Sequence, residues 1–344
     1  MSFENPKPLR ISVSDLTYFS DCRRQWYWNR TYSSKRPDPR FWLGTITHSG
    51  LEGYFKNNRD MSHGMDYFET QVQKSIRDIR EEFSPIWSSI VPEFDTLYVT
   101  AAGMLQNYSI MDHEDPFQGE IYFVEKYARI PLPGLVGNQS QTIEISGRMD
   151  LVLKHKKELH LVDHKTSASL FSPNGLEVDE QMTAYSWMLW KLENQIPEMV
   201  TYDVLIKSLP EEPRVLKEKG SPLSLDKGQP TVYSLYLGAL QDRGWEKEER
   251  YAPMLNYLKA AGWSKYFQRL SSTRNQHELE SFEDRARAKA LDILRILDNP
   301  ETFAYPSPST YRCGGCPFLM VCKSKDDGGD FQYMLDSSFK KGSW

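Results

Sequence analysis

The stretch TIEISGRMDLVLKHKKELHLVDHKTS, residues 142–167, predicts the central part of this protein. Apolar and polar residues alternate from Ile143 to Leu153 and again from Leu159 onward, which is typical of β-strands. The polar segment KHKKE between the two halves is short enough to be a turn. We therefore expect two neighbouring strands in a setting rich in Leu, Val and Ile.

Charged residues interrupt these apolar strands. Asp150 lies in the otherwise apolar run MDLVL, and Asp163 and Lys165 share one face of the second strand. An ionised group among apolar neighbours is costly unless it is paired or binds a cation. Two carboxylates and an ammonium suit Mg²⁺ or Mn²⁺ and its activated water. On the D-x-K triplet alone, a buried ion pair is the simpler interpretation.

Two predicted helices carry further polar candidates. The segment LGTITHSGLEGYF predicts a helix that turns His48 inward, where a neutral imidazole can ligate a metal. The segment VDEQMTAYSWMLWKL predicts a helix with Gln181 and Tyr185 one turn apart on one face. The alternatives are a structural histidine and an amphipathic helix with Tyr185 in its core.

The four cysteines fall in two distant places. Cys22 lies in a helix expected to open near Ser14, and Cys313, Cys316 and Cys322 form a C-x2-C-x5-C pattern. Disulfides are disfavoured in a reducing compartment, and four buried free thiols are an alternative. Zinc fits poorly because one half of the pattern is a lone cysteine, whereas an iron–sulfur cluster accepts irregular spacing.

Length and composition narrow the class of protein. The chain has 344 residues and a net charge of -5, and 39% of its residues are hydrophobic. We expect a globular, soluble and cytoplasmic protein, because the sequence shows neither a signal-peptide pattern nor a long apolar run. The acidic balance does not exclude a nucleic-acid enzyme, which needs only a local basic groove. Such a strip is predicted in residues 23–42, where six basic residues interleave with aromatic ones: Arg23, Arg24, Arg30, Lys35, Arg36 and Arg40.

These motifs, in this order, resemble the PD-(D/E)XK nuclease superfamily. They are His48, GRMD ending at Asp150, VDHKT with Asp163 and Lys165, and QMTAY with Gln181 and Tyr185. More narrowly, the chain is similar to the RecB-like exonuclease branch. The opening ISVSDLTYFSDCRRQWYW and the closing cysteines resemble its iron–sulfur members, the AddB nuclease domain and the CRISPR-associated RecB-type exonucleases.

The resemblance implies an α/β fold, in which helices flank a central mixed sheet with a restriction-endonuclease-like core. It implies His48, Asp150, Asp163 and the backbone carbonyl of His164 as ligands of Mg²⁺ or Mn²⁺. Lys165 would position the attacking water, with Gln181 and Tyr185 in support, and Glu125 would lie near the site. The four cysteines, Cys22, Cys313, Cys316 and Cys322, would hold a structural [4Fe–4S] cluster.

The expected organisation follows from these motifs. Residues 1–43 and 300–325 form a helical iron–sulfur clasp, and residues 44–209 and 276–299 form the nuclease core. Residues 210–275 are an insertion, and residues 326–344 are a mobile C-terminal tail.

The expected function is a metal-dependent DNA exonuclease for single strands or duplex ends in recombination, repair or processing. The alternatives are an adaptation-type nuclease that trims DNA within an integrase complex, and a DNA-binding scaffold that does not cut. The sequence contains no Walker A motif, so a helicase would be a separate partner, as would a recombination protein or an integrase.

Overall fold

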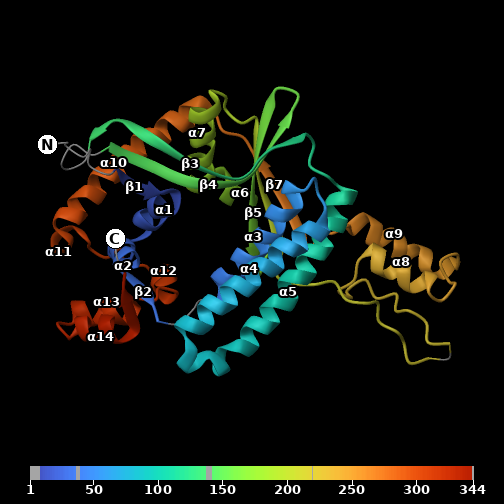
Figure 1. Ribbon diagram of the computed structural model, residues 1–344. Helices are drawn as coiled ribbons and strands as arrows, with labels where there is room; N and C mark the ends of the chain where they lie inside the picture. The colour runs from blue at the N-terminus through green and yellow to red at the C-terminus, as the bar shows by residue number, and fades with distance from the viewer. Residues whose placement is uncertain (1–7, 36–38, 137–141, 219, 343–344) are drawn as a thin grey trace.

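A mixed β-sheet lies between helices in the computed structural model, which describes residues 8–35, 39–136, 142–218 and 220–342 (Figure 1). The predicted α/β class with a central mixed sheet is confirmed. The strands of this sheet are β1 (Leu9–Ser12), β3 (Glu120–Val136), β4 (Thr142–His155), β5 (Glu158–Ser167), β6 (Met199–Ile206) and β7 (Phe267–Ser272). Their order is β1-β4-β5-β6-β7, and β3 pairs with β4. The β1–β4 and β5–β6 pairs are parallel, and the other pairs are antiparallel.

Strand β4 changes partner part-way along its length. It pairs with β1 from Ile143 to Ser146 and with β5 from Leu151 to His155, while β3 follows it on the other edge. Asp150 lies at this change of partner. The ribbon also switches its buried faces here, because Met149 packs in one core and Leu151 in the other, although strand alternation would place both on one face.

Two layers of helices bury the two faces of the sheet. Apolar residues of α1 (Val13–Asp21), α7 (Glu180–Glu193) and α10 (Gln276–Asp298) pack on one face. Those of α3 (Pro39–Lys56), α4 (Met61–Glu82) and α5 (Trp87–Glu114) form the core on the other. A short helical turn, Ser84–Ile86, joins α4 to α5, and α6 (Pro173–Glu177) precedes α7. Among the described residues, none of the helices has both the length and the apolar character needed to cross a membrane.

The segment predicted as an insertion contributes to the central sheet. Helices α8 (Tyr233–Gln241) and α9 (Ala252–Ala261), with the turn Glu249–Tyr251 between them, form a small core of their own beside the main body (Figure 1). Strand β7, however, pairs with β6 from Phe267 to Ser272. The last part of residues 210–275 therefore belongs to the sheet.

The two ends of the chain fold together. The N-terminal side contributes α2 (Arg23–Thr31) and β2 (Tyr32–Ser34). The C-terminal side contributes α11 (Pro300–Phe303), α12 (Thr310–Gly314), α13 (Leu319–Asp326), α14 (Phe331–Ser338) and β8 (Phe339–Lys341). Strands β2 and β8 pair, and Trp28 packs with Phe318 and Phe339. The expectation of a mobile tail is therefore wrong, since α14 and β8 complete this terminal lobe.

The periodicity of the sequence predicts that Cys22 lies inside a helix, but the structure places it between two helices. It is extended, with φ -162, and stands between the end of α1 and the start of α2. Neither Gly nor Pro marks this break in the sequence, so the apolar periodicity runs through it unchanged.

Candidate active site

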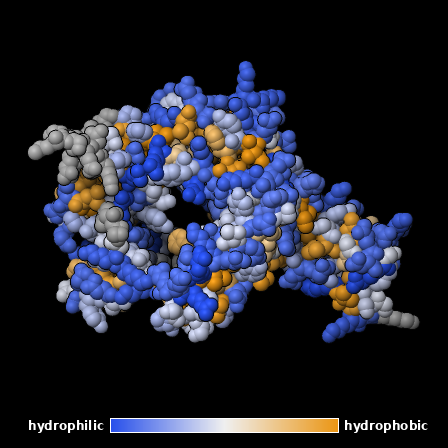
Figure 2. All heavy atoms as spheres, viewed as in Figure 1, coloured by the Kyte–Doolittle hydropathy of each residue, from blue (hydrophilic) through white to orange (hydrophobic). Residues whose placement is uncertain are grey.

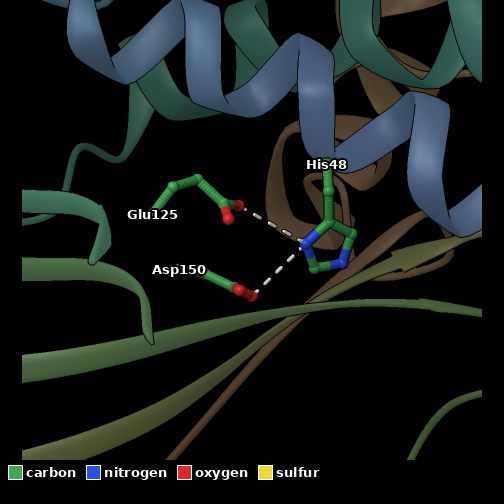
Figure 3. Close-up of side chains that lie close together, drawn as sticks. All are labelled: His48, Glu125 and Asp150. Carbon is green, nitrogen blue, oxygen red and sulfur yellow. Dashed lines mark ion pairs between the residues drawn. The ribbon is translucent and has the colours of Figure 1, made fainter. Parts of the chain in front are cut away.

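Three side chains from three elements converge where β4 changes partner (Figure 3). Helix α3 supplies His48, β3 supplies Glu125 and β4 supplies Asp150. His48 Nδ1 lies 3.5 Å from Asp150 Oδ2 and 3.9 Å from Glu125 Oε1. Among the described residues, they are the one group of three or more His, Cys, Asp or Glu whose donor atoms all lie within 4.8 Å of one another.

Glu125 occupies this position with a strained backbone. Its φ of 52 lies in the left-handed region, which is uncommon for a residue other than glycine. Its place opposite Asp150, between the pairs Lys126–Met149 and Val124–Leu151, coincides with the switch of buried faces. The bend thus brings a carboxylate of β3 toward the carboxylate of β4.

Strand β5 places the D-x-K pair beside this group. Lys165 Nζ lies 2.7 Å from Asp163 Oδ2 and donates to Gln181 Oε1 at 2.8 Å. Gln181 Nε2 in turn donates to the hydroxyl of Tyr185 at 3.2 Å. The buried ion pair of the simpler interpretation is therefore present, and it lies next to the other acids.

His164 serves the site through its backbone. Its N–H donates to Asp150 Oδ2 at 2.9 Å, whereas its ring stacks on Phe55 and places Nδ1 3.2 Å from Asp203 Oδ2. The side chain of His164 thus belongs to the core beneath α3, and its main chain contacts Asp150.

The electrostatics reflect crowded negative charge. Burial raises the pKa of Glu125, and Asp150 raises it further, to about 7. Burial lowers the pKa of His48, but Asp150, Asp163 and Glu125 outweigh this effect and raise it to about 9. Burial also raises the pKa of Asp150, yet His48 and His164 hold it at about 2. A cation among these carboxylates would relieve their mutual repulsion, so the donor set and its charge fit a divalent metal.

The sequence matches the family model described as PD-(D/E)XK nuclease superfamily over residues 10–323. The chain belongs to this superfamily. PD-(D/E)XK nucleases use divalent metals and act on DNA. Among solved structures, the chain is similar to one titled "Crystal structure of SSO0001", with 12% identity, a TM-score of 0.33, and coverage of 94% of this chain and 89% of that one. No curated protein matches the sequence.

Gly147 of the GRMD motif allows Tyr185 of helix α7 to pack closely against β4. A Cβ atom at this position would lie 2.8 Å from Tyr185 Cε1 and 3.0 Å from Val13 Cγ2. Real side chains do not tolerate such contacts, so glycine is required for this close packing. The motif therefore contributes packing space as well as Asp150.

A buried charged network lies behind the His48–Glu125–Asp150 group. Arg269 of β7 lies 3.1 Å from Asp203 Oδ1 and 2.8 Å from Asp112 Oδ1, and both carboxylates are fully buried. Asp203 also meets the ring of His164, whose backbone holds Asp150. The network therefore connects β5, β6, β7 and α5. The one sign of it in the sequence is Asp203 within the apolar strand MVTYDVLI.

The four cysteines line one cavity of about 350 Å³ in the terminal lobe. All four are free thiols, and three of their sulfurs accept hydrogen bonds: Cys22 from Ser307 N, Cys313 from Ser309 N, and Cys322 from Arg24 Nη1. No three of the four sulfurs, all from described residues, lie within 4.8 Å of one another.

Several residues of the basic strip predicted in residues 23–42 form ion pairs or are buried within the protein. Arg23 pairs with Asp292, Arg24 with Asp326 and Arg30 with Asp15. Trp26, Trp28 and Trp42 are buried. Phe41 remains 68% exposed, whereas Arg36 and the side chain of Arg40 lie outside the described part of the chain. Arg23 and Arg30 therefore join α2 to the core helices α10 and α1, and Arg24 joins α2 to α13 within the terminal lobe.

Proposed function

We propose that this chain is a metal-dependent DNA exonuclease that hydrolyses phosphodiester bonds on single strands or at duplex ends. The observation that carries the proposal is the convergence of His48, Glu125 and Asp150 beside the Asp163–Lys165 pair. We assign His48, Glu125, Asp150 and Asp163 as ligands of the cation. The backbone carbonyl of His164 is a further ligand in this proposal. The exonuclease mode rests on the resemblance to the RecB-like branch.

The proposed chemistry is hydrolysis by an oriented water. A divalent cation at this site would polarise a phosphate oxygen and lower the pKa of a bound water. Lys165 is held by Asp163 on one side and by Gln181 on the other. Burial lowers the pKa of Lys165, but Asp163 and Asp150 raise it above its usual value, so the group stays an ammonium. In this proposal Lys165 orients the water as a hydrogen-bond donor.

Digestion of labelled DNA tests this proposal. We expect linear single strands to be shortened from an end in Mg²⁺ or Mn²⁺, and digestion to stop when EDTA is added. A covalently closed single-stranded circle of the same sequence should resist, because it has no end. Binding without metal-stimulated cleavage would contradict the proposal and favour a scaffold. Rapid cutting of the circle would contradict the exonuclease mode.

We also propose that Cys22, Cys313, Cys316 and Cys322 hold a structural [4Fe–4S] cluster. Four thiolates around one cavity are the usual ligands of such a cluster, and N–H donors to sulfur are typical surroundings. Zinc sites usually take two close cysteine pairs, whereas one half of this pattern is a lone cysteine, and a cluster accepts such irregular spacing.

Purification without oxygen tests the cluster. We expect a brown protein with about four irons per chain, and Cys316→Ser should lose both colour and iron. Since Cys22 and the other three lie about 290 positions apart along the chain, loss of the cluster should also lower the melting temperature. A colourless protein with one zinc per chain would contradict the cluster and leave the nuclease proposal intact.

The biological pathway of such an enzyme would depend on which protein supplies its DNA ends. A helicase, a recombination protein or an integrase is the kind of partner this proposal requires. Recovery of an integrase with the intact chain would favour the adaptation-type role.

A further inference from the structure

The ribbon of β3 and β4 has one open face on the approach to Asp150. Ile143, Ile145 and Met149 of β4 are buried in the core with α1 and α7. The intervening residues point to the opposite face. Here Arg148 lies opposite Tyr127 of β3, and Ser146 lies opposite Arg129, so that each pair shares this face.

Arginines follow one another along this open face. The side chain of Arg148 is 61% exposed and that of Arg10, on the adjacent β1, is 49% exposed. Their partners are Glu125 at 3.5 Å and Glu144 at 3.6 Å. Both arginine side chains are about half exposed or more, so a phosphate can contact them, whereas their carboxylate partners are only 11% and 20% exposed. The face therefore carries accessible positive charge next to the proposed metal ligands.

The open face leads into a large cavity. The cavity, of about 860 Å³, is lined by Arg10 and Ser146 from the sheet and by Tyr18 and Phe41 from the helices. Figure 2 shows that the molecule is hollowed between the arm formed by α4 and α5 and the terminal lobe. The phenyl ring of Phe41 is 68% exposed, although it lines a concave surface.

Helix α3 joins this cavity to the metal-ligand group. Phe41 precedes His48 by seven residues, so both lie on the same face of the helix, two turns apart. Two turns span about 10 Å, which equals about three base steps of 3.4 Å. The helix and β4 therefore run from the ligands to the same cavity. Phe41 lies on the helix, and the arginines lie on β4 and on its neighbours β3 and β1.

We propose that a single DNA strand lies along this open face, with its phosphates on Arg148, Arg129 and Arg10 and a base stacked on Phe41. The proposal rests on the proposed nuclease function and adds its strand-binding subsite. A base inside a duplex cannot stack on an exposed ring, because the neighbouring base pairs cover both of its faces. Phe41 thus favours unpaired DNA a few nucleotides from the bond that is cut.

Substitution of Phe41 tests the stacking. Binding of a labelled single-stranded 12-mer is measured in an Asp150→Asn background, which is not expected to cut. Phe41→Ala should weaken binding about 5- to 100-fold, and Phe41→Trp should restore it. Tyr333→Ala, which removes a ring that is 70% exposed on α14, is the matched control and should change nothing. Equal losses on a blunt duplex, or no loss on the single strand, would overturn the proposal.

The salt dependence of binding tests the phosphate contacts. Each contact removed should reduce the slope of log K against log salt by about 0.7 for a single strand. Arg129→Gln should show this reduction, whereas Arg285→Gln on the exposed side of α10 should not. An unchanged slope for Arg129→Gln would overturn the path along the sheet. Cleavage by the parent protein is measured separately, so a failed path is distinguishable from a failed nuclease.

Discussion

Asp150→Asn is expected to lower metal-stimulated DNA cleavage by about 10³-fold or more. A catalytic cation contributes several kcal/mol of transition-state stabilisation, and each 1.36 kcal/mol is a factor of ten in rate. Asp150 lies closest to His48 in the metal-ligand group and has the lowest pKa of its carboxylates, about 2. Its replacement removes the negative charge that is most firmly ionised at neutral pH.

The asparagine variant separates metal binding from folding. Its amide oxygen can still accept the hydrogen bond that His164 N donates at 2.9 Å, so the β4–β5 junction should be preserved. Initial rates at saturating Mn²⁺ and circular dichroism of the same sample give the two readings. Asp284→Asn, on an exposed position of α10, is the control and should cut at the parent rate. A fully active Asp150→Asn enzyme would show that the metal-ligand group lies elsewhere.

Arg269→Met should destabilise the protein by about 3–5 kcal/mol. Loss of one partner from a buried ion pair leaves an uncompensated charge, and penalties of this size are typical. Here the guanidinium serves two fully buried carboxylates, Asp112 and Asp203, and also covers the ring of Phe117. Methionine keeps much of the apolar stem, so the loss reports mainly on charge and hydrogen bonds.

Urea unfolding measures this change in the free energy of unfolding. Arg285→Met provides the comparison, because Arg285 is exposed and donates to Ser281 Oγ on its own helix. It should change stability by less than about 0.5 kcal/mol. An Arg269→Met protein as stable as the parent would mean that the network behind the site does not support the fold.

The strands and the D-x-K pair could be predicted because their signals are local. Alternation over residues 143–165 specifies two strands, and the period of two places Asp163 and Lys165 together. The inward turn of His48 follows in the same way from helical periodicity. Each of these signals concerns one strand or helix and the face on which a residue lies. The placement of Asp163, Lys165 and His48 could therefore be predicted without knowledge of distant contacts.

Long-range contacts explain what the sequence did not reveal. The resemblance placed Glu125 only near the site, and it reaches His48 and Asp150 through a left-handed backbone at a bend that no alternation pattern encodes. Arg269 lies in the segment that was predicted to be an insertion, and it pairs with Asp112, which is 157 positions away in the sequence. In the sequence, Arg23 and Arg24 predict part of a DNA-binding strip. In the structure they form ion pairs with Asp292 and Asp326. Charge in a sequence predicts a partner but not which one.

Binding of Mn²⁺ tests the metal centre most directly. Electron paramagnetic resonance of free Mn²⁺, titrated with protein in the absence of DNA, counts the bound ions and gives their affinity. The parent protein should remove Mn²⁺ from solution at the His48–Glu125–Asp150 group, and Asp150→Asn should weaken this binding by about 100-fold or more, since loss of supporting partners alone costs 10- to 100-fold. Equal Mn²⁺ binding by the two proteins would contradict a metal centre at this position.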